Sequence, residues 1–260
     1  MTEIRATNPT AAVLIIGNEI LSGKTQDINL NAIALRLLPL GIKLTEARVV
    51  ADEETAIIAA VNALRAVYDY VFTTGGIGPT HDDITAAAVA KAFGRAVVEN
   101  PEARARLLGY YGAEKLTPAR LRMALMPEAA ILINNPVSVA PGFQVENVFV
   151  LAGVPDIMRA MFEDCVARLQ AGPAYQSRTI NCLVAESLVA EPLRAIADEF
   201  SDCSIGSYPW FRLGQYGLSI VVRGTDSARL DAAAAAILAL TRQQDSSAML
   251  AVSVHSSGGV

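Results

Sequence analysis

Short apolar segments alternate along the chain with longer segments in which apolar residues recur every three or four positions. Ala12–Ile16 is a continuous apolar run that ends at a glycine, as buried strands do. Ile42–Val50 is a second predicted strand, and Tyr70–Thr74, which also ends at a glycine, is a third. The segments between them predict helices, the first beginning near Asp27 and the second capped by Asp52. Because strands joined by helical crossovers pair in parallel, this order predicts a mostly parallel sheet in an α/β fold.

The same alternation continues to about residue 172. A third helix begins near Asp83, and two more begin at Pro101 and Pro118, each behind a capping residue. Ala171–Pro173 then interrupts the series, and a smaller α+β unit follows. The later elements that the pattern predicts are the strands Ala130–Ile133, Val148–Leu151, Arg178–Val184 and Gly217–Arg223, and the helices Pro155–Leu169, Glu191–Phe200 and Ser227–Arg242.

We therefore expect three parts along the chain. Residues 1–172 form the larger α/β domain, residues 173–243 form the small α+β domain, and residues 244–260 form a tail. The tail is rich in serine and glycine and has one apolar patch, Met249–Val254. We expect it to be flexible, or to add a strand to a neighbouring sheet.

Composition and charge narrow the class of protein. The 260 residues are 52% hydrophobic, yet the longest apolar runs are far shorter than the roughly 20 residues that cross a bilayer. A net charge of −5 argues against a broad nucleic-acid-binding surface. The first ten residues lack the apolar core of a secretory signal, and Cys165, Cys182 and Cys203 lack metal-ligand spacing. We expect a cytoplasmic protein with reduced thiols that binds neither a membrane nor nucleic acid.

The strongest candidate for a functional site is Gly75–Thr85, which follows a buried strand and precedes a helix. Its glycines, Gly75, Gly76 and Gly78, let the backbone approach a ligand closely, and the N-terminus of the following helix favours phosphate. The spacing matches neither the Rossmann fingerprint nor the P-loop, which needs a lysine. A tight turn whose aspartates only cap the helix is the structural alternative.

Two adjacent carboxylates, Asp82 and Asp83, would repel a nucleotide at this loop unless a cation lies between them. Mg²⁺ prefers one or two carboxylates together with substrate phosphate oxygens, so the pair predicts a metal-assisted phosphate site. Alternatively, one of them caps the helix and the other is solvated. Four further segments follow strands at the carboxyl edge of the sheet and should reach the same site: Gly17–Gly23, Asp52, Asn134–Gly142 and Ala152–Pro155.

Four segments resemble a known family. GNEIL at Gly17–Leu21, GGIGPTHDDIT at Gly75–Thr85, NPVSVAPGF at Asn135–Phe143 and AGVP at Ala152–Pro155 resemble the MoaB/Mog-type molybdopterin-binding family. They are most similar to the amino-terminal domain of the CinA (competence/damage-inducible protein A) family. The second unit, with Ile205–Pro209, resembles the small domain that follows in CinA proteins. The resemblance implies a three-layer α/β/α domain with a mostly parallel sheet, followed by a small α+β KH-like domain.

The resemblance also implies two activities. CinA-type members are associated with metal-dependent hydrolysis of the pyrophosphate bond in ADP-ribose-like nucleotides, and MoaB/Mog-type members bind molybdopterin and adenylylate it. Carried over by position, Asp83 and Asp52 would be catalytic, and Asp82 and Asp83 would bind the metal. The implied nucleotide- or pterin-binding residues are Gly17, Glu19, Gly75, Gly76, Gly78, Thr80, Ser138, Pro141 and Gly142. The implied cofactor is a divalent metal, Mg²⁺ or Co²⁺, with K⁺ and molybdopterin as further candidates, and the implied assembly is a homodimer or homotrimer.

The sequence departs from the family pattern at two positions. Ser138 stands where glycine is usual, which would narrow the pocket, and Ala152–Pro155 reads AGVP rather than PGVP. No segment matches the carboxy-terminal amide-hydrolase domain of CinA, so we do not expect deamidation of nicotinamide mononucleotide. His81 is expected to be a solvated loop residue. A ligand-binding or assembly module without catalysis is the remaining hypothesis.

Overall fold

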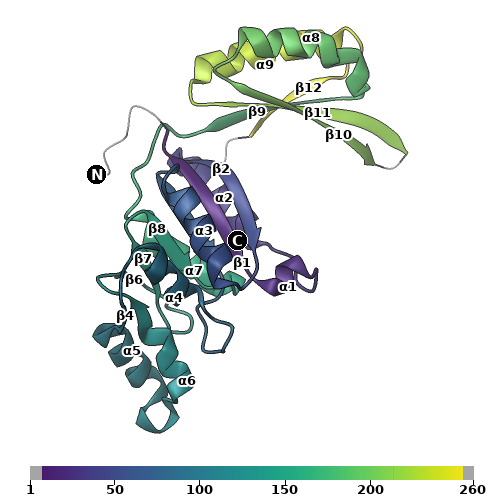
Figure 1. Ribbon diagram of the computed structural model, residues 1–260. Helices are drawn as coiled ribbons and strands as arrows, with labels where there is room; N and C mark the ends of the chain where they lie inside the picture. The colour runs from purple at the N-terminus through teal and green to yellow at the C-terminus, as the bar shows by residue number, and fades with distance from the viewer. Residues whose placement is uncertain (1–7, 213, 254–260) are drawn as a thin grey trace. The chain divides into compact units, whose positions relative to one another are not determined.

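The chain forms two compact units, each with its own sheet and its own core. The structure is a computed structural model and describes residues 8–212 and 214–253. One unit comprises Met1–Leu38 and Ile42–Gly172, and the other comprises Pro39–Gly41 and Pro173–Val260. Their elements are labelled in Figure 1.

A six-stranded sheet forms the centre of the first unit. Its strands are β1 (Thr10–Ile16), β2 (Lys43–Val50), β3 (Tyr70–Thr74), β6 (Ile131–Ile133), β7 (Gly142–Val145) and β8 (Val148–Leu151). The strand order is β2-β1-β3-β8-β7-β6. The first four strands are parallel, as the sequence predicts, whereas β7 is antiparallel to both β8 and β6. The sequence pattern did not predict β7.

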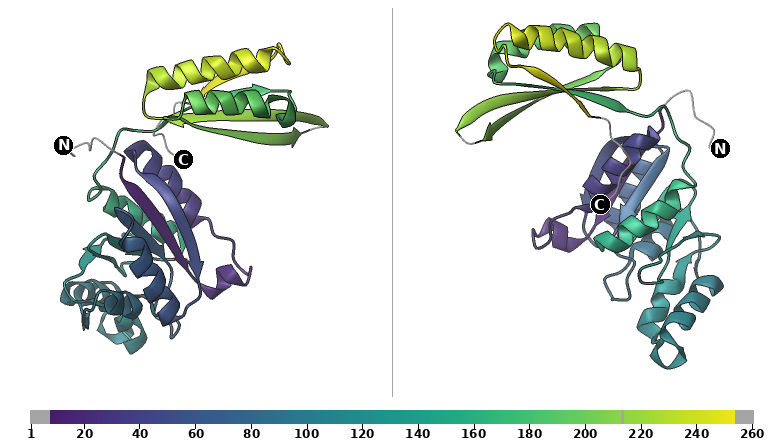
Figure 2. Two further views of the ribbon diagram at one scale, coloured as in Figure 1. Left: turned by 45° about the horizontal axis from the view of Figure 1, so that its top comes forward. Right: turned by 180° about the vertical axis from the view of Figure 1, so that it is seen from behind.

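Helices cover both faces of this sheet and complete three layers. The helices are α1 (Asn18–Leu21), α2 (Asn29–Leu37), α3 (Glu54–Arg65), α4 (Thr85–Ala92), α5 (Pro101–Tyr111), α6 (Pro118–Leu121) and α7 (Pro155–Val166). The helices α3 and α4 pack together on one face, and α2 and α7 pack together on the other (Figures 1 and 2). The helices α5 and α6 begin at prolines behind the capping side chains of Asn100 and Thr117. They accompany a separate two-stranded ribbon of β4 (Val97–Glu99) and β5 (Leu125–Pro127).

The position of each strand explains its sequence. In the middle of the sheet, β1 and β3 are buried on both faces, so β1 is a nearly continuous apolar run and β3 consists of apolar residues followed by two buried threonines. At the edge, the residues of β2 alternate between exposed and half-buried. Val71 belongs to the core cluster with α3 and α4, whereas its neighbour Phe72 packs against Phe162 of α7, with ring centroids 5.0 Å apart.

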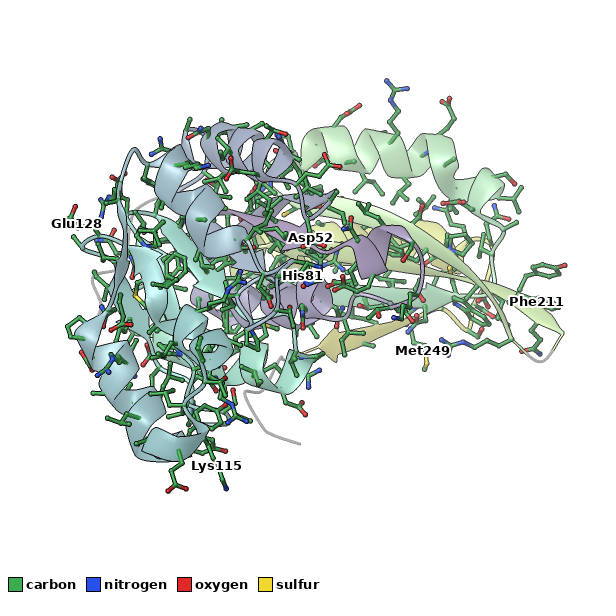
Figure 3. All side chains as sticks on the ribbon, turned by 60° about the horizontal axis from the view of Figure 1, so that its bottom comes forward. Asp52, His81, Lys115, Glu128, Phe211 and Met249 are labelled. Carbon is green, nitrogen blue, oxygen red and sulfur yellow. The ribbon has the colours of Figure 1, made fainter. Side chains whose placement is uncertain are left out.

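The second unit is an antiparallel sheet with two helices on one face. Its elements are β9 (Gln176–Cys182), α8 (Glu186–Glu199), β10 (Ser204–Arg212), β11 (Gln215–Gly224), α9 (Ser227–Arg242) and β12 (Met249–Ser253). The strand order is β10-β11-β9-β12, and α8 and α9 lie side by side over the same face (Figures 1 and 2). Phe211 lies near the far end of the β10–β11 ribbon (Figure 3) and is 61% exposed. A separate α+β region therefore follows the parallel sheet, as predicted.

Several local predictions need correction. Asp52 does not cap α3, which begins at Glu54; its carboxylate instead accepts a hydrogen bond from the N–H of Asn18. The helix α8 begins at Glu186, earlier than predicted, with Pro192 inside it. The apolar patch of the tail pairs with β9 as the strand β12, so the predicted added strand is present; residues 254–260 lie outside the described residues. No helix in the described part of the chain is long and apolar enough to span a membrane.

Candidate functional site

The loops that follow the parallel strands meet at the carboxyl edge of the first sheet. The N–H groups of Gly17 and Gly75 lie 3.2 Å from the carbonyl oxygens of Val50 and Leu151, respectively. An added methyl group on Gly75 would lie 2.1 Å from the carbonyl oxygen of Ile16, so the loop after β3 packs directly on the end of β1. The predicted convergence of these loops is therefore present.

The loop Gly75–Gly78, called here the glycine loop, is tightly folded against the start of α4. Gly75 and Gly76 have φ values of 103° and 68°, which residues with a side chain rarely adopt. Thr85 is fully buried; its N–H donates to Gly76 O and its hydroxyl donates to Gly75 O, both at 3.0 Å. A methyl group on Gly76 would lie 2.2 Å from the Thr85 hydroxyl oxygen. Glycine is therefore needed at position 76 for backbone conformation and for space.

Three consecutive amide groups of the glycine loop have no hydrogen-bond acceptor among the described residues. They are the N–H groups of Gly76, Ile77 and Gly78, whereas the N–H groups of Gly75 and Thr85 are both used within the protein. Backbone amides gathered in a tight loop, next to a helix N-terminus, are typical of anion-binding sites, phosphate above all. The loop therefore has the donors that a phosphate group needs.

Thr80 lies between the two carboxylates that follow the loop. The Oδ2 atom of Asp83 accepts a hydrogen bond from the Thr80 N–H at 2.7 Å and another from the Thr80 hydroxyl. The same hydroxyl lowers the pKa of the exposed Asp82 carboxyl, with a further contribution from the backbone N–H of Asp82. The His81 side chain, labelled in Figure 3, is 96% exposed, as predicted. Asp83 is therefore a fixed, half-buried acceptor, and Asp82 is a solvent-facing anion.

Two pockets border the glycine loop. The first, called here the Arg122 pocket, has a volume of about 90 Å³ and is lined by Gly76, Gly78, Asp83 and Arg122. Most of its other walls are apolar, from Val97, Met123, Leu125, Pro141 and Phe143. A pocket with apolar walls and a single cation suits a flat ring that carries, or lies next to, a phosphate group.

The second pocket, called here the Asn29 pocket, has a volume of about 60 Å³ and shares Gly75 with the glycine loop. Its polar lining comes from Glu19, Thr25, Gln26, Asp27, Asn29 and Thr74. Neither Asn29 nor Arg122 was predicted from the sequence. A signal for Asn29 was available, because it shares the buried face of α2 with Ile33 and Leu37, where a polar side chain is unusual. No comparable signal marks Arg122.

The structure places the predicted site residues in three groups. Glu19 and Gly75 line the Asn29 pocket, whereas Gly76, Gly78, Asp83 and Pro141 line the Arg122 pocket. The predicted residues that line neither pocket are Gly17, Asp52, Thr80, Asp82, Ser138 and Gly142.

Ser138 and Gly142 have structural contacts instead. The Ser138 hydroxyl accepts a hydrogen bond from Asn135 Nδ2 at 2.7 Å, so this serine narrows neither of the two pockets. A methyl group on Gly142 would lie 2.4 Å from Val150 O, so glycine is needed there for the pairing of β7 with β8. Both residues therefore support the walls of the site from outside.

The donor set at the glycine loop suits a cation only together with a phosphorylated ligand. In the described parts of the chain, no group of three or more His, Cys, Asp or Glu side chains could hold a metal ion. Asp82 and Asp83 can supply carboxylate oxygens, and Mg²⁺ characteristically combines one or two such oxygens with water and substrate phosphate. Asp52, labelled in Figure 3, already accepts a hydrogen bond from Asn18 N–H at 2.8 Å. Metal binding by Asp82 and Asp83 therefore stays a prediction that depends on a bound phosphate.

Comparison with known proteins places the first unit in a family. Residues 12–171 match the family described as "Probable molybdopterin binding domain". The chain belongs to this molybdopterin-binding domain family. The match confirms the MoaB/Mog-like α/β domain predicted from the motifs. Residues 174–248 match a second family, described as the middle domain of FAD synthase, and the KH-like nature of this region stays a prediction.

Similar proteins match most of the chain. A protein from Pyrobaculum calidifontis is 36% identical over 212 residues, which cover 77% of this chain and 81% of that protein. A CinA-like protein from Geotalea uraniireducens is 36% identical over 75% of this chain, but the match spans about half (49%) of that protein. The crystal structure of the protein CinA with unknown function from Thermoplasma acidophilum superposes with a TM-score of 0.59 at 36% identity, over 62% of this chain and 98% of that chain. These relatives confirm the resemblance to CinA-like proteins.

Proposed function

We propose that this protein hydrolyses the pyrophosphate bond of ADP-ribose-like nucleotides with the help of a divalent cation. The observation that carries the proposal is the position of the glycine loop, whose residues line both pockets. A ligand with two phosphates on the loop would place one end group in the Arg122 pocket and the other in the Asn29 pocket. A nucleotide with a group at each end of a pyrophosphate has this form.

Each residue of the loop region then has a defined task. The N–H groups of Gly76, Ile77 and Gly78 donate to phosphate oxygens, and Arg122 adds positive charge next to the bound phosphates. The Asp83 carboxylate, held by Thr80, accepts a hydrogen bond from the attacking water and takes up its proton. The water oxygen bonds to one phosphorus as the bond from that phosphorus to the bridging oxygen breaks. The products are AMP and ribose 5-phosphate, and the protons released go to solvent.

Two further carboxylates act less directly. The Asp52 carboxylate accepts a hydrogen bond from the N–H of Asn18, so Asp52 is a positioning residue for the loop after β1. Asp82, together with Asp83 and the phosphate oxygens, would hold the cation. A bound cation would neutralise charge on the two phosphates and on the leaving oxygen.

The test is direct assay of the purified protein with ADP-ribose and Mg²⁺ or Co²⁺, with AMP and ribose 5-phosphate quantified by chromatography. Asp83→Asn should lower kcat by roughly 10²–10⁴-fold, the range for removal of a positioned acid–base group. The control is Asp198→Asn, an exposed carboxylate on α8, which should leave the rate unchanged. EDTA should stop hydrolysis without shifting the urea midpoint of the nucleotide-free protein. No AMP from the wild type, under conditions in which a known pyrophosphatase is active, would overturn the proposal.

A second candidate function is molybdopterin binding or adenylylation. The family match of residues 12–171 favours it, and the apolar walls of the Arg122 pocket suit the flat ring of a pterin. When the protein is co-expressed with the enzymes of molybdopterin synthesis, it should then be purified with a bound pterin, which is fluorescent after oxidation. The Arg122→Met variant should be purified without this pterin. Purified protein without pterin would count against this candidate.

A further inference from the structure

Asn29 is a buried polar residue whose carbonyl oxygen lacks a hydrogen-bond partner. The residue lies at the start of α2 and is only 5% exposed. Its Nδ2 donates to the carbonyl oxygen of Gly153 at 2.7 Å, but its Oδ1 accepts nothing from the described residues. Buried acceptors are nearly always paired, because an unpaired one is costly. Thr73 Oγ1 is also buried and unpaired, but Thr73 does not line the Asn29 pocket.

The neighbouring backbone fixes the orientation of this amide. Exchanging the oxygen and nitrogen of the Asn29 amide would place two carbonyl oxygens 2.7 Å apart, which no hydrogen bond could compensate. Gly153 is in turn packed against the glycine loop, since a methyl group on it would lie 3.3 Å from Gly75 Cα. Asn29 is therefore held near the glycine loop by two successive contacts, its own hydrogen bond to Gly153 and the packing of Gly153 on Gly75.

The lining of the Asn29 pocket favours acceptors over positive charge. Glu19 and Asp27 contribute carboxylates, and Asp27 Oδ1 already accepts from the N–H of Leu30 at 3.0 Å. No lysine or arginine lies among the residues that line this pocket in the described chain. Such a lining disfavours a phosphate group and suits an uncharged group that donates hydrogen bonds.

We propose that the Asn29 pocket binds a hydroxyl or amino group on the nucleoside part of the ligand, and that Asn29 Oδ1 accepts its hydrogen bond. The proposal rests on the proposed function and adds a specificity-determining residue to it. Asn29 Oδ1 gains a hydrogen-bond partner only when a ligand with the matching donor group binds. A ligand without that donor would leave the oxygen buried and unpaired, and a site of this kind rejects such ligands strongly.

The experiment combines changes in the protein with changes in the ligand. Binding of AMP, IMP, 2′-deoxy-AMP and 3′-deoxy-AMP is measured by calorimetry with Mg²⁺ present, because these monophosphates have no pyrophosphate bond that could be cleaved during the measurement. IMP lacks the amino group, and each deoxy-nucleotide lacks one hydroxyl group. The wild type should bind one of the three analogues about 10-fold more weakly than AMP, the effect of one lost hydrogen bond. Asn29→Ala should bind AMP about 10-fold more weakly, and should no longer distinguish that analogue from AMP.

The control is Asn147→Ala, which removes another internal asparagine of the same unit. Asn147 Nδ2 donates to the carbonyl oxygens of Arg65 and Tyr68, at 3.0 and 2.9 Å, at the opposite edge of the sheet. This variant should lose stability but keep the affinity for AMP. If Asn29→Ala does not fold, Asn29→Ser takes its place, because the shorter side chain also withdraws the amide oxygen from the pocket.

The possible results separate this proposal from the proposed function. Equal affinity of the wild type for all four nucleotides, or the same discrimination by Asn29→Ala, would overturn the role of Asn29 even if ADP-ribose is cleaved. Loss of discrimination in Asn29→Ala without any cleavage of ADP-ribose would support Asn29 and overturn the hydrolase proposal. No binding of any of these nucleotides would overturn the role of Asn29, and the assay with ADP-ribose would then decide the hydrolase proposal on its own.

Discussion

Replacing Gly76 with alanine should destabilise the first unit by about 2–5 kcal/mol, the sum of a backbone term and a contact term. Gly76 has a φ of 68°, and an alanine in this left-handed region costs about 1–2 kcal/mol. The added methyl group would also lie 2.2 Å from the hydroxyl oxygen of Thr85, which is fully buried. Displacing that hydroxyl breaks its hydrogen bond to Gly75 O, which adds about 1–3 kcal/mol.

Gly94→Ala is the matched control for the contact term. Gly94 has a φ of 64°, but an added methyl group there would meet no atom within 4 Å. Its replacement should therefore cost only the backbone term of about 1–2 kcal/mol. The assay is urea unfolding followed by far-UV circular dichroism, because the one tryptophan, Trp210, lies in the second unit. An equal decrease in the free energy of unfolding for Gly76→Ala and Gly94→Ala would refute the contact with Thr85. So would a double variant, Gly76→Ala with Thr85→Ala, whose loss of stability equals the sum of the losses of the two single variants.

Two further predictions concern the Arg122 pocket and the thiols. Arg122→Met should raise the KM for ADP-ribose about 5- to 10-fold at low salt with little change in kcat. The reason is that an exposed cation next to a phosphate contributes about 1 kcal/mol to binding and is screened by salt. An unchanged KM would show that the Arg122 pocket does not bind phosphate. Burial raises the pKa of Cys165 to about 12 and also raises the pKa values of Cys182 and Cys203. In the folded protein at pH 8, iodoacetamide should therefore react first with the half-buried Cys203 and leave Cys165 unmodified, and mass spectrometry that finds Cys165 alkylated early would contradict this order.

The central strands of the first sheet could be predicted from the sequence because burial on both faces leaves continuous apolar runs. Short strands carry no such record: β4 and β5 have three residues each and β7 has four, too few for a periodic pattern. The interpretation of Asp52 failed for a different reason. Its carboxylate accepts a hydrogen bond from the N–H of Asn18 instead of capping α3, and this contact depends on how the loops after β1 and β2 meet.

The candidate site divides in the same physical way. The glycine loop could be located from the sequence, since its tight backbone needs glycine at particular positions and that requirement is local. The pocket walls come from distant segments: Asn29 reaches Gly153 across 124 positions, and Arg122 follows a helix outside the main sheet. Asn29 is nevertheless an intermediate case, because a polar residue on the buried face of a helix is a local departure from the expected pattern. Where a polar residue lies on the buried face of a helix that packs near a glycine loop, an unpaired polar atom of that residue is a reason to expect ligand recognition rather than packing alone.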